Sequence, residues 1–230
     1  ESNLAFVFGF FVIYFILERR SRVYQVVAIF FFILCFKRIA IAAVVLSVGT
    51  YYILSFFRIN ISEHRKKFII LVVLVNLLFV KITSLIVLGV FDELVLFTTG
   101  NSTDRFLMGR QQFYTEVFTR ASGNWLGLGL GKVDDIMFDF MHFPVNLHSE
   151  VLKNYFEFGF IIFTVWLILI FHKNLFSNKA AALLIYFNVL ILTDNVFIYF
   201  DIMFYFYFFV LIYLVQKNED SLKSISDPVK

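Results

Sequence analysis

Side chains that bind anions and move protons gather between residues 146 and 157. The stretch "NLHSEVLKNYFE" opens with Asn146 and His148, then places Glu150, Asn154 and Glu157 at the entrance to an apolar run. These last three residues have the spacing i, i+4 and i+7, so a helix would present them on one face. Polar groups on one face of an apolar helix must look into protein or into a wet cavity rather than into lipid.

His148 is the candidate general base of this stretch. Ser149 is a suitable N-cap residue, and the N-terminus of a helix attracts anions through its free N–H groups and its dipole. His148 would therefore stand beside a natural phosphate site, with a side chain able to take a proton near neutral pH. The alternative is that His148 only caps the helix or lies on the surface. His142 is a second candidate nearby.

Three arginines precede this stretch, at Arg105, Arg110 and Arg120. A guanidinium can bind a phosphate oxygen pair through two parallel hydrogen bonds, so each is a candidate anion contact. Glycines at 123, 127, 129 and 131 follow them and would let backbone approach backbone or a ligand closely. A flexible surface loop is the alternative interpretation. The spacing is not that of a nucleotide-binding loop.

Composition places these residues in a membrane protein. Hydrophobic residues make up 60% of the chain and charged residues 16%, whereas soluble domains have roughly 45–50% and 25%. The apolar runs are continuous, which fits helices and not the alternating strands of a barrel. We therefore expect an all-α, polytopic membrane bundle. The net charge of +3 gives no reason to expect a nucleic-acid partner, and the single cysteine, Cys35, excludes an internal disulfide.

Seven apolar runs predict about seven spans, with a break at 193–195 between the last two. The runs cover residues 3–17, 22–36, 39–57, 68–91, 154–171, 179–193 and 199–216. The resulting segments are N-terminal membrane helices (1–91), a long loop (92–150), C-terminal membrane helices (151–216) and a tail (217–230). The chain starts at Glu1 on the edge of an apolar run, so we expect its N-terminal part to be incomplete.

Basic residues set the orientation, since cytoplasmic connections are rich in Lys and Arg. They cluster after the first run, between the third and fourth, around the fifth and in the tail, which makes 217–230 cytoplasmic and 92–150 extracytoplasmic. Lys37 and Arg38 break the pattern, and they either snorkel from a tight turn or face an anion at the outer surface. Lys81 lies inside the fourth run, where a charge suggests function or a partner such as Glu150 or Asp92.

The chain resembles the O-antigen polymerase and ligase superfamily, the Wzy-like and WaaL-like membrane glycosyltransferases. "CFKRIAIAAVVLS" (35–47) resembles the basic turn that opens a helix in that family. "MGRQQFYTEVFTRASGNWLGLGLG" (108–131) resembles its Gly-Arg and later Gly-rich turn. "NLHSEVLKNYFEFG" (146–159) resembles its element of spaced His, Leu, Glu and Gly, although members often carry Asn where this chain has Ser149.

The resemblance implies a GT-C-like fold in the bacterial inner membrane, with a periplasmic site. It implies that undecaprenyl-pyrophosphate-linked oligosaccharides are polymerised into O-antigen or capsular polysaccharide, with membrane lipid and a chain-length regulator as further partners and without metal or cofactor. His148, Arg110 and Glu157 are the expected catalytic residues. Pyrophosphate or glycan contacts are then expected from Lys37, Arg38, Arg105, Arg120, Asn146 and Asn154.

Three alternatives remain open. An O-antigen ligase would run the same chemistry with lipid A–core as acceptor. A transporter or flippase of polysaccharide precursors would show paired repeats and broken midplane helices, whereas the unusual charges here lie at one face and in one long loop. A non-catalytic scaffold would not need the outward Arg and His side chains.

Overall fold

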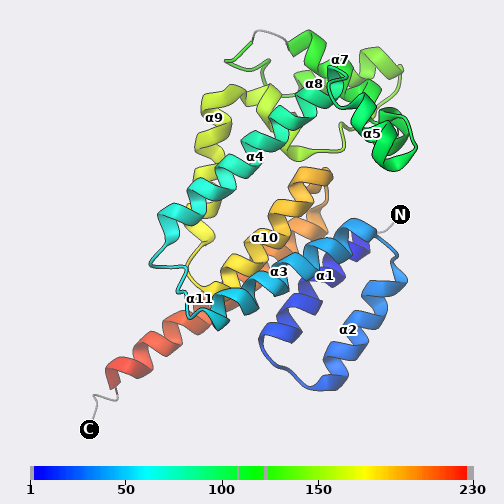
Figure 1. The fold of residues 1–230 in the computed structure, drawn as a ribbon. Coiled ribbons are helices and arrows are strands. Elements are labelled where there is room, and N and C mark those ends of the chain that lie inside the picture. Colours follow the sequence, from blue (N-terminus) through cyan, green and yellow to red (C-terminus); the bar gives the residue numbers. More distant parts are fainter. Residues whose placement is uncertain (1–2, 108, 122–123, 227–230) are drawn as a thin grey trace. The chain divides into compact units, whose positions relative to one another are not determined.

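The chain is helical wherever the structure describes it. A computed structural model describes residues 3–107, 109–121 and 124–226, and these form α-helices, one short 3₁₀ helix and connecting turns, with no strand among them (Figure 1). The helices form two compact units. Unit 1 comprises Glu1–Ile69, Ile170–Leu190 and Val196–Lys230, and unit 2 comprises Ile70–Leu169 and Ile191–Asn195.

Unit 1 is built around its first helix, α1 (Asn3–Leu17), which packs against α2 (Arg22–Leu34), α3 (Arg38–Phe56) and α11 (Phe200–Ser226). Phe6, Phe10 and Ile13 of α1 are fully buried. Tyr186 of α10 (Asn178–Thr193) stacks edge-on against Phe10 and donates a 2.9 Å hydrogen bond to the Phe6 carbonyl. The core of this unit is thus made mostly of rings and aliphatic side chains.

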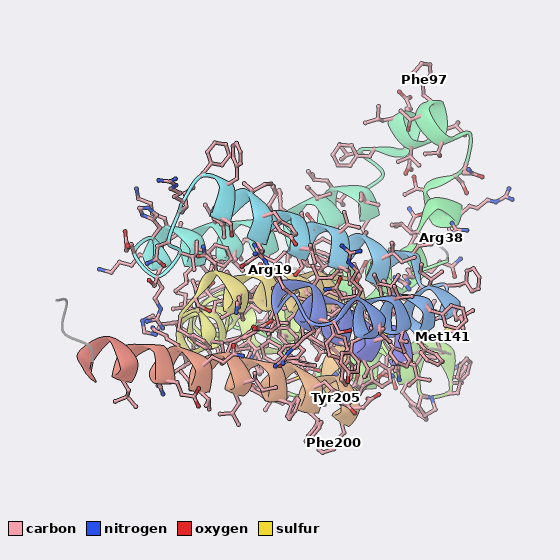
Figure 2. The ribbon with its side chains drawn as sticks, turned by 90° about the horizontal axis from the view of Figure 1, so that it is seen from below. Arg19, Arg38, Phe97, Met141, Phe200 and Tyr205 are labelled. Carbon is pink, nitrogen blue, oxygen red and sulfur yellow. The ribbon has the colours of Figure 1, made fainter. Side chains whose placement is uncertain are left out.

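Among the described residues, four helices are long and apolar enough to cross a membrane. They are α3, α4 (Arg65–Val87), α9 (Glu150–Asn174) and the Phe200–Glu219 part of α11. Many large apolar side chains remain exposed on the molecule, as Phe97 and Phe200 do in Figure 2, and a soluble surface would not tolerate so many. The structure therefore has the features of a helical membrane protein.

All seven predicted apolar runs are helical, but three of the helices are short. α1, α2 and α10 have 15, 13 and 16 residues, fewer than the ~20 that usually span a bilayer. The break predicted at 193–195 is confirmed, since α10 ends at Thr193 and α11 starts at Phe200 after a 3₁₀ turn (Val196–Ile198).

Unit 2 contains the segment 92–150, which the sequence predicts to be a long loop. It forms α5 (Asp92–Thr99), α6 (Thr103–Phe106), α7 (Gln111–Ala121) and α8 (Lys132–Met141), and α7 packs against α8 (Figure 1). Each of the last two helices buries one apolar stripe. The buried residues are Tyr114, Val117 and Ala121 in α7 and Val133, Ile136 and Met137 in α8.

Candidate functional site

The polar stripe of α9 faces protein, as predicted. Ser149 caps the helix by accepting a 3.2 Å hydrogen bond from the Leu152 N–H. Glu150, Asn154 and Glu157 are only 5%, 7% and 5% exposed. Burying polar groups is costly unless other groups satisfy them. The N-terminal part of α9 is therefore polar and buried, whereas the rest of the helix is apolar.

A backbone crossing separates the polar part of α9 from its apolar part. Gly159 has φ 73° and ψ 171°, which interrupts the helix. The loop around Gly127 lies against this kink through three backbone hydrogen bonds: Leu128 N–H to the Phe156 carbonyl (2.8 Å), Gly129 N–H to the Glu157 carbonyl (3.0 Å) and Phe160 N–H to the Trp125 carbonyl (3.1 Å). The glycines thus serve backbone–backbone approach, one of the two roles that the sequence suggested.

Only glycine fits at the two centres of this crossing. A Cβ on Gly127 would lie 2.5 Å from the Glu157 carbonyl oxygen, and one on Gly159 would lie 2.5 Å from the Trp125 carbonyl oxygen. Both residues also have positive φ, where L-residues are strained. The Gly-rich stretch and the Glu-x-Gly stretch, distant in the chain, are therefore one structural joint.

Glu157 lies under this joint and supports α8. Its carboxylate is buried near the backbone N–H groups of Gly131 and Val133, at the N-terminus of α8, and its Oε1 atom has no hydrogen-bond partner among the described residues. The neighbouring Lys153 forms a 2.6 Å ion pair with Asp134 of α8. This end of α9 is thus connected to α8, and the predicted catalytic role of Glu157 stays a prediction.

Arg110 lies at the start of α7, in a cavity of about 200 Å³ within unit 2. Residues from α4, Leu107, Tyr114, Leu192 and Thr193 line it with Arg110. The guanidinium donates a long, 3.5 Å hydrogen bond to the Thr193 carbonyl and lies by the Tyr114 phenol. Burial raises the pKa of Tyr114, and the nearby Arg110 charge partly offsets this rise. The phenol therefore stays neutral, and the guanidinium remains the positive group of the cavity.

The break after α10 joins Arg110 to the start of α9. Arg110 bonds to the carbonyl of Thr193, and the backbone N–H of Glu150 bonds to the carbonyl of the next residue, Asp194, at 3.2 Å. Arg110 and Glu150 are therefore bonded to consecutive residues, and His148 lies two residues before Glu150 in the chain. His148 itself has φ 52°, a sparsely populated conformation that recurs at functional sites.

The N-terminus of α9 offers fewer free N–H groups than the sequence suggested. The Glu150 and Leu152 amides are already bonded to Asp194 and Ser149. Asn146 is exposed just before this turn, whereas the Asn154 Nδ2 atom is buried without a hydrogen-bond partner among the described residues. An anion here would depend on side chains more than on the helix end.

The other two arginines are placed differently. Arg120, at the opposite end of α7, lies about 15 Å along the helix from Arg110. It forms an ion pair with Glu116 of the same helix (2.7 Å) and one with Asp139 (3.3 Å), which connects α7 to α8. Arg105 is exposed on the short helix α6. Of the three, Arg110 is the one that lines the cavity described above.

Lys37 and Arg38 belong to unit 1. Lys37 occupies the N-cap position of α3, as the resemblance to a basic turn suggested, and its Nζ lies 3.7 Å from the centre of the Phe6 ring. Arg38 is exposed at the first position of the helix. Their predicted meeting with Arg110 and His148, which are residues of unit 2, stays a prediction.

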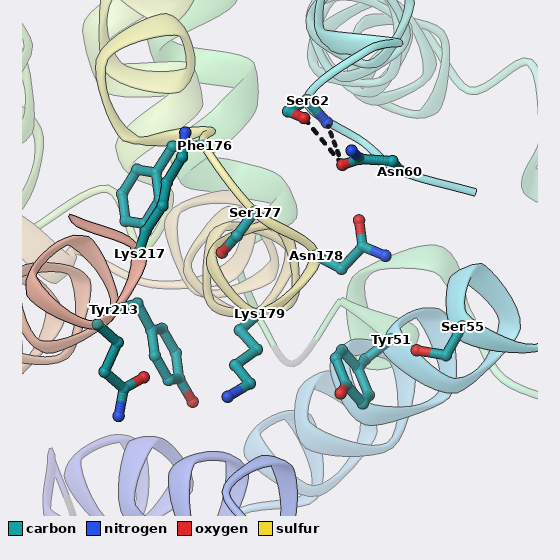
Figure 3. A pocket seen from close by; sticks show the side chains of 11 residues that line it. Tyr51, Ser55, Asn60, Ser62, Phe176, Ser177, Asn178, Lys179, Tyr213 and Lys217 are labelled. Atoms are coloured by element: carbon teal, nitrogen blue, oxygen red, sulfur yellow. Dashed lines mark hydrogen bonds between the residues drawn. The ribbon is translucent and has the colours of Figure 1, made fainter. Parts of the chain in front are cut away.

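Unit 1 has a larger cavity, of about 550 Å³, lined by none of the predicted site residues (Figure 3). Its polar lining has structural roles. Asn178 accepts a 2.9 Å hydrogen bond from the Ile61 N–H and donates one of 2.8 Å to the Ile59 carbonyl, while Lys179 forms a 2.7 Å ion pair with Glu18. The two Asn178 bonds hold the 59–62 turn at the start of α10, and the Lys179 pair connects α10 to Glu18, the residue after α1.

Sequence reasoning overlooked Tyr114 and the 193–194 carbonyls. Tyr114 stands four residues after Arg110, and this spacing puts both side chains on one helix face. Their proximity could therefore have been predicted from the sequence. The carbonyls could not have been found this way, because their approach to Arg110 and Glu150 joins segments far apart in the chain. In the described part of the chain, no group of three or more His, Cys, Asp or Glu side chains could hold a metal ion.

Comparison of the chain with protein-family models, with curated proteins and with solved structures found no match.

Proposed function

We propose that the protein is a membrane glycosyltransferase that polymerises oligosaccharide repeat units carried on undecaprenyl pyrophosphate. The observation that carries the proposal is the bonding of Arg110 and of Glu150, two residues after His148, to the consecutive carbonyls of Thr193 and Asp194. Transfer from a pyrophosphate needs a cation at the leaving group and a base at the attacking hydroxyl. Arg110 and His148 are side chains of these two types.

In the proposed reaction, an acceptor sugar hydroxyl attacks the anomeric carbon of the donor. The new carbon–oxygen bond forms as the bond to the pyrophosphate oxygen breaks, and the leaving undecaprenyl pyrophosphate keeps the electron pair. His148 accepts the hydroxyl proton, and the Arg110 guanidinium stabilises the charge that develops on the pyrophosphate. A donor aimed at developing charge contributes about 3–4 kcal/mol in well-studied enzymes.

Glu157 acts in this scheme by positioning. Its carboxylate lies near the N-terminus of α8, and the Gly127–Gly159 joint fixes the loop that follows α7. Both ends of α7 are then held, one at Arg110 and one at the loop. We place the site on the periplasmic side of the bacterial inner membrane, on the basis of the charge distribution along the chain.

The test replaces the full-length gene in its source bacterium with Arg110→Ala, Arg110→Lys and His148→Ala variants. We expect the ladder of surface-polysaccharide lengths to collapse to single repeats on lipid A–core in both alanine variants. Arg110→Lys should restore part of the ladder, because it retains charge but not the two-pronged geometry. Arg22→Ala, an exposed arginine of α2, is the matched control, and membrane levels of each variant are measured alongside.

Two outcomes would count against the proposal. A normal ladder in His148→Ala or Arg110→Ala cells, at normal protein levels, removes the catalytic assignment. Accumulation of long lipid-linked chains without transfer to lipid A–core indicates a ligase instead of a polymerase.

A further inference from the structure

Lys81 lies in the apolar helix α4 and has no role in the proposed reaction. It is six residues before the end of α4 at Val87, or about 9 Å along the axis. Its side chain is exposed and makes no ion pair with any described residue. One suggested partner, Asp92, instead accepts a hydrogen bond from Thr103. A cation inside an apolar helix favours a nearby negative charge.

A groove of about 450 Å³ lies beside Lys81, within unit 2. Leu77 and Lys81 of α4 form one side, and Tyr155 and Phe160 of α9 contribute to its lining together with Phe118 and Trp125. The lining is thus mostly apolar and aromatic, with Ser84 and Asn124 as polar members and Lys81 as its charged side chain. Trp and Tyr are the residues that favour the level of lipid headgroups.

We propose that this groove binds an anionic membrane phospholipid, with its phosphate against the Lys81 ammonium and an acyl chain along the aromatic side chains. Charge complementarity selects this occupant. Lys81 is the single cation of the lining, which matches the single charge of a phosphodiester and falls short of a pyrophosphate. α4 is long and apolar enough to lie in the bilayer where such lipids are found. The site is independent of the glycosyl-transfer proposal.

The groove contains its own reporter, Trp125. The chain has two tryptophans, so a Trp166→Phe background leaves Trp125 as the sole source of tryptophan fluorescence. The full-length protein is placed in nanodiscs that contain phosphatidylglycerol or phosphatidylcholine with brominated acyl chains, whose bromines quench nearby tryptophan. We expect brominated phosphatidylglycerol to quench Trp125 at a lower mole fraction than brominated phosphatidylcholine.

Substitutions at Lys81 then test the phosphate contact. Lys81→Gln should weaken the apparent affinity for phosphatidylglycerol about fivefold, the size of effect of one basic residue at an anionic lipid surface. Lys81→Arg should retain the preference. Lys67→Gln, which removes an exposed lysine from the other end of α4, is the matched control and should change nothing.

Equal quenching by the two brominated lipids, or quenching unchanged in Lys81→Gln, would overturn the proposal, because the groove would then be an ordinary lipid-facing surface. Displacement of brominated phosphatidylglycerol by undecaprenyl phosphate at a small fraction of its mole amount would also overturn it, since the occupant would then be a polyprenyl lipid. The polysaccharide ladder is a separate readout, so a failed lipid test leaves the enzymatic proposal intact.

Discussion

The two units bury different kinds of side chain. Unit 1 surrounds α1 with rings, and Phe6, Phe10 and Phe209 are at most 1% exposed. Unit 2 instead buries Glu150, Asn154 and Glu157 and breaks its longest helix at Gly159. Close packing of apolar side chains gives stability, whereas buried charge and irregular backbone usually mark functional sites. The contrast favours unit 2 as the location of a functional site.

The comparison also shows which kind of contact each unit depends on. In unit 1, the contact joins a side chain to a helix backbone, since the Tyr186 hydroxyl donates a hydrogen bond to the Phe6 carbonyl. In unit 2, backbone meets backbone at Gly127 and Gly159. Backbone cannot move aside as a side chain can, so the same Gly→Ala change should cost more in unit 2.

The largest effect is expected at the backbone crossing. Gly159→Ala and Gly127→Ala would each place a Cβ against backbone at positive φ. Backbone strain and overpacking together should lower the free energy of unfolding by about 3 kcal/mol or more. Thermal unfolding and limited proteolysis of the purified protein in detergent measure this change.

Gly49→Ala is the matched control for the crossing. Gly49 lies inside α3 with no atom within 4 Å of a built Cβ, so alanine there should stabilise the helix by about 0.5–1 kcal/mol. If Gly159→Ala unfolded at the temperature of Gly49→Ala, the crossing would not be the rigid joint described here.

A smaller loss is expected for Gly9→Ala in unit 1. Its Cβ would overlap the Tyr186 phenol, with the ring carbon Cζ 2.5 Å away. Overpacking of this kind costs about 1–3 kcal/mol. Combining it with Tyr186→Phe should recover part of the loss because the hydroxyl is removed, and the unfolding temperatures of the single and double variants show this. Strict additivity of the two changes would contradict the described contact.

The smallest effect concerns the Tyr114 phenol in alkali. Its pKa is raised in the folded protein, so above the ordinary tyrosine pKa of about 10 the unfolded chain loses a proton that the folded one keeps. Folding is then disfavoured as pH rises. At neutral pH, Tyr114→Phe should cost about 0.5–1.5 kcal/mol, and this cost should shrink above pH ~10. Denaturation midpoints of both proteins from pH 8 to 11 measure it, and parallel curves would refute the shift.

The helices were largely predictable because each depends on local patterning. Every apolar run became a helix, and Thr193-Asp194-Asn195 ended one because these side chains compete for backbone hydrogen bonds. The buried stripe of α9 followed from spacing alone. Span number was harder to predict, because an apolar run of 13–16 residues does not reveal whether it crosses a bilayer.

The site was predictable only in part. Arg110 and His148 were proposed from residue type, and this role stays a prediction, whereas the carbonyls that bond to Arg110 and Glu150 are groups that the sequence does not distinguish. Arg120 was assigned to the substrate although Glu116, four residues earlier, offered an ion pair on the same helix face. The glycine joint needs two segments about thirty residues apart, and glycine content alone does not pair them.

The glycine crossing has a consequence for how this protein can change over time. Since the joint depends on main-chain atoms, the side chains around it, such as Trp125, Leu126 and Phe160, can be exchanged without loosening it. The surface around the joint can thus change by point substitution, while the two glycines keep the scaffold in register.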